Sequence, residues 1–315
     1  MVLVTGATGF VGRALVKALV KRGDWPVRAA VRHGGHDLTG LGQGIFMTDI
    51  ASGSDWTQGL TGVNVVVHTA ARVHIQREQV ANPLAAFRKI NVQGTLALAS
   101  QAAAAGVRRF VFLSSVKVNG EETAPRRPFT EDDVPAPRDP YGTSKMEAEA
   151  GLQQIAAETG MELVIIRPPL VYGPGVGANF KALMHAVARG MPLPLAQLDN
   201  RRSLVALDNL LDFIVVCMGH PGAANETFLV SDGEDLSTPE LIRRMALALE
   251  RPARLFPVPL GLLRAGASML GKRDTLQRLA GNLQVSIHKA ANLLGWSPAA
   301  IMDQVLRRTA KEWNP

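Results

Sequence analysis

Tyr141 and Lys145 are four positions apart at the start of a predicted helix, so their side chains share one helix face. Hydride transfer to a carbonyl needs a proton donor, and the reverse reaction needs a base. A free phenol has a pKa of about 10, and a neighbouring lysine cation lowers that value. Ser114 and Ser115 end the preceding predicted strand, where a hydroxyl can bond the reacting oxygen. These residue types predict an acid–base centre for carbonyl–alcohol redox chemistry.

A glycine-rich loop follows the first predicted strand and opens the first predicted helix, with the spacing Gly6-x-x-Gly9-x-x-Gly12. Glycine permits the tight turn and lets a pyrophosphate approach the backbone, whose N–H groups at the helix start bind the phosphates. The loop therefore predicts a dinucleotide site. Its predicted ligands are Gly6, Thr8, Gly9, Phe10, Val11 and Gly12.

The residue after the second predicted strand bears on the choice of cofactor. An acidic residue there would bind the 2′-hydroxyl of NAD. The sequence has Arg32 instead, and an arginine suits the 2′-phosphate of NADP through bidentate charge-assisted bonds. We expect NADP(H) with Arg32 as a ligand, and NAD(H) remains the alternative.

The elements that must position these residues alternate along the first half of the chain. Continuously apolar runs indicate parallel strands covered on both faces, and strand–helix alternation implies right-handed crossovers. We therefore expect an α/β fold with a Rossmann-like, doubly wound parallel sheet. Predicted strands are Val2–Val4, Val27–Val31, Ile45–Thr48, Val63–His68, Phe110–Ser114 and Leu163–Arg167, and predicted helices are Gly12–Lys21, Pro83–Ala105 and Tyr141–Thr159.

Proline and glycine cluster after Arg167, and helical patterns then dominate, including Pro239–Glu250 and a helix from Arg278 onward. We expect a dinucleotide-binding domain over residues 1–169 and a smaller, mainly helical substrate lobe over residues 170–315, with segments that return to the first domain. Residues 119–140 carry several prolines and charges, which predict a surface loop that borders a site. The apolar stretch Phe256–Leu270 is expected to be a core helix rather than a membrane contact.

Composition excludes several classes of protein. The 315 residues are 47% hydrophobic and 19% charged, which predicts a globular protein with a sizeable core. The net charge is +7, but the basic residues are scattered, so nucleic-acid binding is not expected. Neither a signal peptide nor a membrane-spanning segment is expected. The single cysteine, Cys217, excludes an internal disulfide and multi-cysteine metal sites. No metal site is expected, and the expected compartment is the cytoplasm.

The order of glycine loop, serine-ended strand and Tyr-x-x-x-Lys resembles the extended short-chain dehydrogenase/reductases, the nucleotide-sugar epimerase/dehydratase group. The resemblance covers nearly the whole chain. Ser114–Gly120 is similar to the family pattern Ser-Ser-x-x-Val-Tyr-Gly, with Asn119 in place of the tyrosine, which implies Ser115, Tyr141 and Lys145 as the catalytic residues. It implies an enzyme with a UDP-linked sugar substrate, commonly a homodimer through the helices at 83–105 and 141–159.

The resemblance also assigns binding residues. Besides the glycine loop and Arg32, the implied cofactor ligands are Asp49, Ile50, Thr69, Ala70, Ala71, Asn91, Ser114, Tyr141, Lys145 and Pro168. The implied substrate ligands are Ser115, Lys117, Asn179, Arg202 and Arg278, of which the arginines and the asparagine suit a diphosphate.

Departures from the family pattern narrow the reaction. Family dehydratases carry Asp-Glu after the catalytic serine, where this chain has Val116 and Lys117, so dehydration is not expected. The segment Val27–Arg32 is similar to NADPH-dependent ketoreductases of the group. The first reading is therefore an NADP(H)-dependent reductase of a nucleotide-linked 4-keto-6-deoxy sugar, of the type that converts UDP-4-keto-6-deoxy-N-acetylglucosamine to UDP-N-acetylquinovosamine for lipopolysaccharide.

Three other functions stay open. The first alternative is a 4-epimerase of a UDP-hexose or UDP-N-acetylhexosamine, which would use the same catalytic residues. A ketoreductase of a flavonoid- or steroid-like substrate would share the catalytic group but not the arginines. A non-enzymatic dinucleotide-binding regulator of the same fold is the most distant reading, because such proteins often lack the tyrosine–lysine pair.

Overall fold

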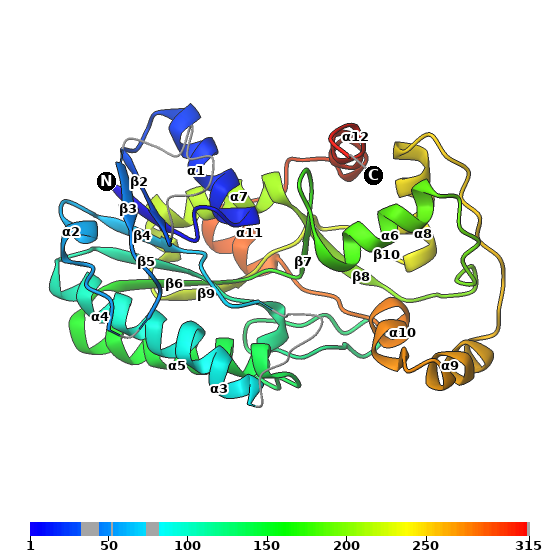
Figure 1. Cartoon of the computed structure of the whole chain (residues 1–315). Coiled ribbons are helices and arrows are strands. Elements are labelled where there is room, and N and C mark those ends of the chain that lie inside the picture. Colours follow the sequence, from blue (N-terminus) through cyan, green and yellow to red (C-terminus); the bar gives the residue numbers. More distant parts are fainter. Residues whose placement is uncertain (33–43, 52, 74–81, 314–315) are drawn as a thin grey trace.

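A seven-stranded parallel sheet forms the centre of the molecule in the computed structural model, which describes residues 1–32, 44–51, 53–73 and 82–313 (Figure 1). The strands stand in the order β3-β2-β1-β4-β5-β6-β9. β1 pairs in parallel with both β2 and β4, so the strand order reverses at β1, and ligands of such sheets bind beside that reversal. The strands are β1 (Val2–Thr5), β2 (Val27–Val31), β3 (Gly44–Met47), β4 (Val65–His68), β5 (Arg109–Leu113), β6 (Glu162–Arg167) and β9 (Glu226–Leu229).

Helices cover both faces of this sheet, so the expected doubly wound α/β fold is confirmed (Figure 1). One face packs against α1 (Phe10–Arg22), α7 (Leu207–Gly219) and α11 (His288–Leu294). The other packs against α2 (Thr57–Leu60), α4 (Thr95–Ala104) and α5 (Pro140–Thr159). Every residue of β1 and β4 is buried, as their unbroken apolar pattern requires, whereas the edge strand β3 alternates between half-buried and exposed.

The predicted helix over Pro83–Ala105 is a helical run with a change of winding. It comprises α3 (Pro83–Phe87), a π-helical stretch (Arg88–Gly94) and α4. Asn82 caps its start by accepting a hydrogen bond from the Ala85 amide. Gly94 ends the π-helical stretch where the chain presses against Ile50, because a Cβ there would lie 2.8 Å from the Ile50 side chain.

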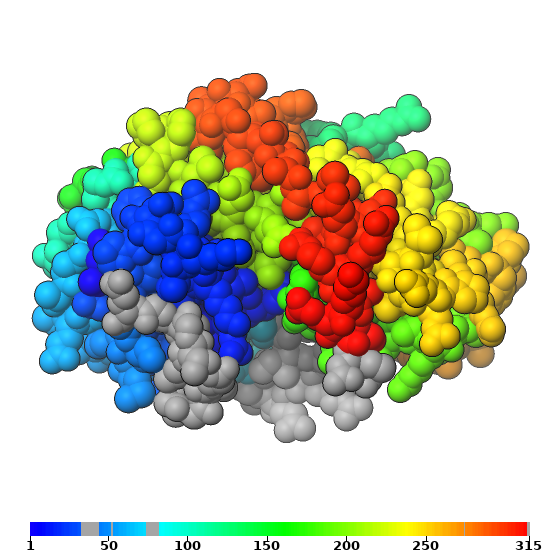
Figure 2. All heavy atoms as spheres, turned by 90° about the horizontal axis from the view of Figure 1, so that it is seen from above, coloured from blue at the N-terminus to red at the C-terminus, as the bar shows by residue number. Residues whose placement is uncertain are grey.

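The second half of the chain builds a smaller lobe around a three-stranded sheet. Its strands, in the order β10-β8-β7, are β7 (Leu170–Tyr172), β8 (Arg202–Ala206) and β10 (Asp235–Leu236). The helices of the lobe are α6 (Ala178–Ala188), α8 (Thr238–Ala248), α9 (Leu260–Met269), α10 (Arg273–Ala280) and α12 (Met302–Lys311). A space-filling view from above shows the residues of α12 lying over the junction of the two halves (Figure 2). β9 and α7 leave the lobe to join the main sheet.

One prediction for this lobe is confirmed only in part and one is wrong. The helical pattern expected from Arg278 onward includes α11 and α12, but it is interrupted after Ala280, where Gly281 is extended and its carbonyl accepts a hydrogen bond from Arg202. The following residues instead bridge to Arg202 and Phe129.

The apolar stretch Phe256–Leu270 is not a core helix. α9 contains no buried residue, and Leu262 and Met269 are 65% and 88% exposed. Leu262 and Met269 form an outward stripe, and Leu263 is the partly buried residue that packs against the core. Among the described residues, no helix is long and apolar enough to cross a membrane.

Candidate active site

A cleft of about 640 Å³ opens at the carboxyl ends of β1, β2, β4 and β5, and we call it the sheet-end cleft. The predicted catalytic residues lie at one end of it and the residues after β2 and β3 at the other. All of the predicted cofactor ligands except Asn91 line it. The lining residues are Gly6, Thr8–Gly12, Ala30–Arg32, Thr48–Ile50, Trp56, Thr69–Val73, Ile90, Leu113–Ser115, Tyr141, Lys145, Pro168, Pro169 and Val171.

The glycine loop is packed as a pyrophosphate site requires. Gly6 has a φ of +68°, and a Cβ there would lie 2.7 Å from the Ala70 amide nitrogen. A Cβ on Gly12 would overlap the Gly6 carbonyl oxygen. The N-cap of α1 is Gly9, which offers no side-chain cap, and Phe10, Val11 and Gly12 line the cleft. The uncapped N–H groups and the positive helix end therefore fit a dinucleotide diphosphate.

A buried histidine fixes the floor of the cleft. His68 lies within 2.7 Å of the Thr5 hydroxyl and 2.9 Å of the Thr95 hydroxyl, and the Thr69 hydroxyl donates to the Thr5 carbonyl at 2.6 Å. Burial, with a smaller contribution from Lys145, lowers the pKa of His68 to about 3. The ring is therefore neutral at physiological pH and organises the loop at Thr69 instead of exchanging protons.

The far end of the cleft holds the predicted ribose ligand. Arg32 is exposed and lines the cleft together with Asp49. Arg28, four residues earlier on β2, has a structural role, because its side chain donates hydrogen bonds to the carbonyls of Gln58, Gly59 and Thr61. Arg32 is thus placed to meet an anionic group bound in the cleft.

Trp56 lines this end of the cleft and was not predicted from the sequence. Its side chain is fully buried, and its Nε1 has no hydrogen-bond partner among the described residues. A single tryptophan directly before the short helix α2 carries no spacing signal, so sequence patterns could not have singled it out.

Ser115, Tyr141 and Lys145 meet at the other end of the cleft, as predicted. Tyr141 and Ser115 are half-buried and line the cleft together. Burial raises the pKa of Tyr141 and nearby Asp139 adds to the rise, while the Ser115 side chain opposes it. Asp139 caps α5 through the Gly142 amide, which fixes the helix that carries Tyr141 and Lys145.

Lys145 is buried behind the tyrosine. Its Nζ donates to the Leu113 carbonyl at 2.8 Å and lies 4.3 Å from the centre of the Phe112 ring. Burial lowers the pKa of Lys145 to about 7, although Glu149 acts in the opposite direction. The ammonium therefore titrates near neutral pH, in the same cleft that the Tyr141 phenol lines.

A buried polar network supports this pair from below. Arg167 and Glu149 form a buried ion pair, with Arg167 Nη2 2.6 Å from Glu149 Oε2. Ser114 donates a hydrogen bond to Glu149, and Arg167 donates to Asn119 at 3.1 Å. The network joins α5 to the ends of β5 and β6, so it holds the catalytic helix against the sheet.

Asn91 does not line the cleft. Its side chain accepts from the Arg72 amide at 2.7 Å, donates to the Arg72 carbonyl at 3.0 Å and donates to the Ser144 hydroxyl at 3.0 Å. It acts on the cleft only through Arg72, which it fixes against α5.

The predicted substrate residues are not brought together. Among them only Ser115 lines the sheet-end cleft. Lys117 forms ion pairs with Asp139 and Glu121. Arg202 is half-buried on β8 and donates to the Gly281 carbonyl at 3.0 Å, and burial lowers its pKa. Asn179 and Arg278 are exposed on α6 and α10 and line neither this cleft nor the pocket described next.

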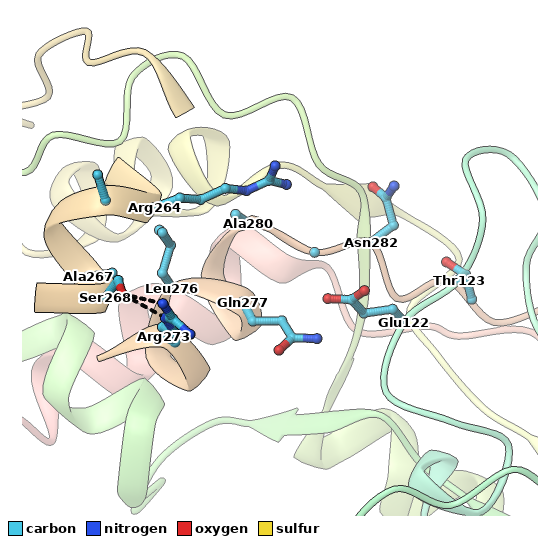
Figure 3. Close-up of a pocket in the computed structure, with 12 residues that line it drawn as sticks. Glu122, Thr123, Arg264, Ala267, Ser268, Arg273, Leu276, Gln277, Ala280 and Asn282 are labelled. Carbon is cyan, nitrogen blue, oxygen red and sulfur yellow. Dashed lines mark hydrogen bonds between the residues drawn. The ribbon is translucent and has the colours of Figure 1, made fainter. Parts of the chain in front are cut away.

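A second cavity of about 760 Å³, which we call the outer pocket, lies between residues 122–123 and helices α9 and α10 (Figure 3). Glu122 and Thr123 belong to the predicted 119–140 loop, which therefore borders a cavity as expected. Arg264 and Glu122 point into the pocket from opposite sides (Figure 3). Among the described residues, no group of His, Cys, Asp or Glu could hold a metal ion.

Comparisons with known proteins agree with this arrangement. A UDP-glucose 4-epimerase of Vibrio cholerae is 46% identical over 312 residues, covering 98% of this chain and 94% of the relative. A UDP-glucuronic acid 4-epimerase of Bacillus cereus, solved in complex with NAD, superposes with a TM-score of 0.80 at 21% identity, covering 99% of this chain and 95% of the other. RMD of Pseudomonas aeruginosa, solved with NADPH, gives 0.74 at 22% identity, covering 99% of both chains.

The family model described as "NAD dependent epimerase/dehydratase family" matches residues 2–231. This span contains the glycine loop and the whole Ser115–Tyr141–Lys145 group, so the matched region is the one that builds the sheet-end cleft. Together with the relative that aligns over nearly the full chain, the match shows that this protein is an enzyme of the NAD-dependent epimerase/dehydratase family.

Proposed function

We propose that this enzyme is an NAD(P)-dependent 4-epimerase of a UDP-hexose. The observation that carries the proposal is the meeting of Ser115, Tyr141 and Lys145 in the cleft that the glycine loop also lines. The relative with 46% identity is named a UDP-glucose 4-epimerase, which favours this reaction over the ketoreductase expected first. The UDP moiety and a homodimer through residues 83–105 and 141–159 belong to the same proposal.

The residues have separate roles in this reaction. When bound, the nicotinamide cofactor supplies the hydride acceptor and a positive charge beside the phenol. Tyr141 takes the proton of the sugar C4 hydroxyl and later returns it. Ser115 hydrogen-bonds the same oxygen and holds it near the phenol. Lys145, which lines the cleft with Tyr141, would stabilise the tyrosinate through the positive charge of its ammonium.

A 4-ketoreductase of a UDP-4-keto-6-deoxy sugar is the second candidate. Arg32 favours it, because this arginine lines the cleft where a 2′-phosphate of NADP would lie. An epimerase retains its cofactor through the cycle, whereas a reductase must exchange it. Weak, reversible NADP(H) binding would therefore support the reductase, and tightly retained cofactor the epimerase.

The test is to incubate the purified protein with UDP-glucose and follow the C4 epimer by proton NMR, without and with added NAD⁺. A parallel reaction contains UDP-4-keto-6-deoxy-N-acetylglucosamine with NADPH or NADH, followed by the loss of reduced-cofactor absorbance. We expect Tyr141→Phe to lower kcat by about 10²–10⁴-fold, since it removes the acid–base group. Tyr172→Phe is the matched control, because Tyr172 bonds Asp232 and does not line the sheet-end cleft.

Formation of the C4 epimer that Tyr141→Phe abolishes supports the epimerase. Rapid oxidation of NADPH by the keto sugar, with no epimer from UDP-glucose, would establish the reductase instead. Arg32→Ala then measures the cofactor choice, and we expect it to raise the Kd for NADPH by about tenfold or more while leaving NADH unchanged.

A further inference from the structure

Residues 251–273 form a segment of unusual composition in the outer part of the lobe, which we call the basic apolar segment. It contains five basic residues and no acidic residue, although the whole chain has 27 of these. The basic residues are Arg251, Arg254, Arg264, Lys272 and Arg273. None of them forms an ion pair with an acidic side chain among the described residues, so the acidic side chains of the described part of the chain do not neutralise their charge.

The same segment exposes a cluster of large apolar side chains. Five of the 15 exposed large hydrophobic residues of the described chain fall in it, namely Phe256, Leu260, Leu262, Met269 and Leu270, with exposures from 37% to 88%. Scattered exposed hydrophobic residues are normal on proteins, whereas a cluster on one element marks an interaction surface.

Helix α9 has two faces with different roles. Leu262 and Met269 are seven residues apart and share one face, and they are 65% and 88% exposed. Arg264 and Ser268 lie on another face and line the outer pocket (Figure 3). The apolar stripe is therefore directed away from the pocket that the same helix borders. α9 lies at the outer end of the lobe, away from α4 and α5 (Figure 1).

We propose that the basic apolar segment docks this enzyme on a membrane surface rich in anionic phospholipids, with the outer stripe of α9 lying in the interface. Interfacial binding combines exposed apolar residues on one helix face with Lys or Arg, and the basic apolar segment carries both kinds of residue. The unpaired basic residues complement anionic headgroups, and each cation near such a surface adds to the attraction. Docking in this way does not require a spanning helix and does not depend on which sugar the enzyme converts.

One consequence is geometric. Because α9 separates the stripe from the outer pocket, docking places the outer pocket one helix away from the headgroups. Arg264 and Arg273, which line the pocket, would then lie in the attractive potential of the anionic surface.

The test is co-sedimentation of the full chain with large unilamellar vesicles of phosphatidylethanolamine and phosphatidylglycerol, against vesicles of phosphatidylcholine alone. We expect binding to the anionic vesicles, weakening as salt is added, and little binding to the neutral ones. Leu262→Ser combined with Met269→Ser should raise the lipid concentration for half-binding by about tenfold or more. Arg251→Gln with Lys272→Gln should weaken binding to the anionic vesicles by about tenfold, and neither residue lines a described cavity.

Ile301→Ser is the matched control. The exposed fraction of Ile301, 59%, is similar to that of Leu262, but Ile301 precedes α12, which lies on the other side of the lobe (Figure 1). It should leave vesicle binding unchanged, and circular dichroism should show that all variants fold. Absence of binding to anionic vesicles would overturn the proposal. So would binding that the α9 variants leave intact, or α9 variants that change only the oligomeric state, which would assign the stripe to a contact between copies of the chain.

Discussion

Lys145 combines two demands that oppose each other. Its ammonium must be charged to stabilise a tyrosinate at Tyr141, yet its side chain is buried against Phe112 with the Leu113 carbonyl as its hydrogen-bond acceptor. Burial lowers its pKa to about 7, so carrying the charge costs folding free energy at neutral pH. This is the expected trade of stability for activity at a catalytic residue.

We therefore predict that Lys145→Met stabilises the protein at about pH 6 while abolishing turnover. In the wild type the cost is fully present below about pH 7, the folded-state pKa, and disappears as the pH rises towards 10.5, the ordinary value for lysine. The difference in Tm between variant and wild type should accordingly shrink between pH 7 and 10. Thermal unfolding across this range measures it, and a difference that does not change with pH would show that the ammonium is not penalised.

At the scale of single elements, the turn from β1 into α1 decides whether the dinucleotide can bind. Gly12→Ala would place a methyl group against the Gly6 carbonyl oxygen, whereas a Cβ at Gly9 would lie 3.2 Å from the same oxygen. We expect Gly12→Ala to raise the Kd for cofactor by about 10²-fold or more, because the loop must open, and Gly9→Ala to have a smaller effect. Fluorescence titration with NADH and NADPH compares them. Equal losses would mean that the N–H groups, and not the packing of Gly12, limit binding.

The junction of α5 with β5 and β6 rests on the buried ion pair of Arg167 and Glu149. Arg167→Met leaves a buried carboxylate without its cation, and we expect a loss of about 3–5 kcal/mol in the free energy of unfolding. Glu149→Leu combined with Arg167→Met should recover most of it, because both charges of the ion pair are then removed. Urea unfolding gives both values. Arg88→Met, which removes an ion pair with Glu147 on the surface of the same helix, is the control and should have a far smaller effect.

Across the whole molecule, the two halves share one hydrophobic core. Phe213, Phe228 and Trp296, from beyond residue 170, pack in the same cluster as Val4 and Val164 of the main sheet, and β9 covers the outer edge of β6. The proposed division after residue 169 therefore separates two roles, because the first part lines nearly all of the sheet-end cleft. It does not separate two independently stable units.

We predict that the full chain unfolds in one cooperative transition and that a fragment of residues 1–169 does not fold stably. The fragment would expose the edge of β6 and lose one wall of its core, which favours aggregation. Near- and far-ultraviolet circular dichroism in urea should coincide for the full chain. Two separate transitions, or a folded monomeric fragment, would contradict this expectation.

Features that depend on neighbouring residues could be predicted from the sequence. The glycine loop, the apolar strands and the i, i+4 pair of Tyr141 and Lys145 are local patterns, because φ, ψ and the direction of a side chain follow from nearby residues. Six of the seven strands of the main sheet were therefore predicted, and the glycine loop, Tyr141 and Lys145 line the cleft.

Only the tertiary structure decides which surface each helix or strand packs against. The apolar pattern of residues 256–270 is compatible with a core helix, yet of the large apolar residues of α9 Leu263 is packed against the core, and Leu262 and Met269 face outward. The helical pattern from Arg278 onward is interrupted after Ala280, where Arg202, distant in sequence, donates a hydrogen bond to the Gly281 carbonyl. Burial and hydrogen-bond partners depend on residues far apart in the chain, and local spacing does not encode them.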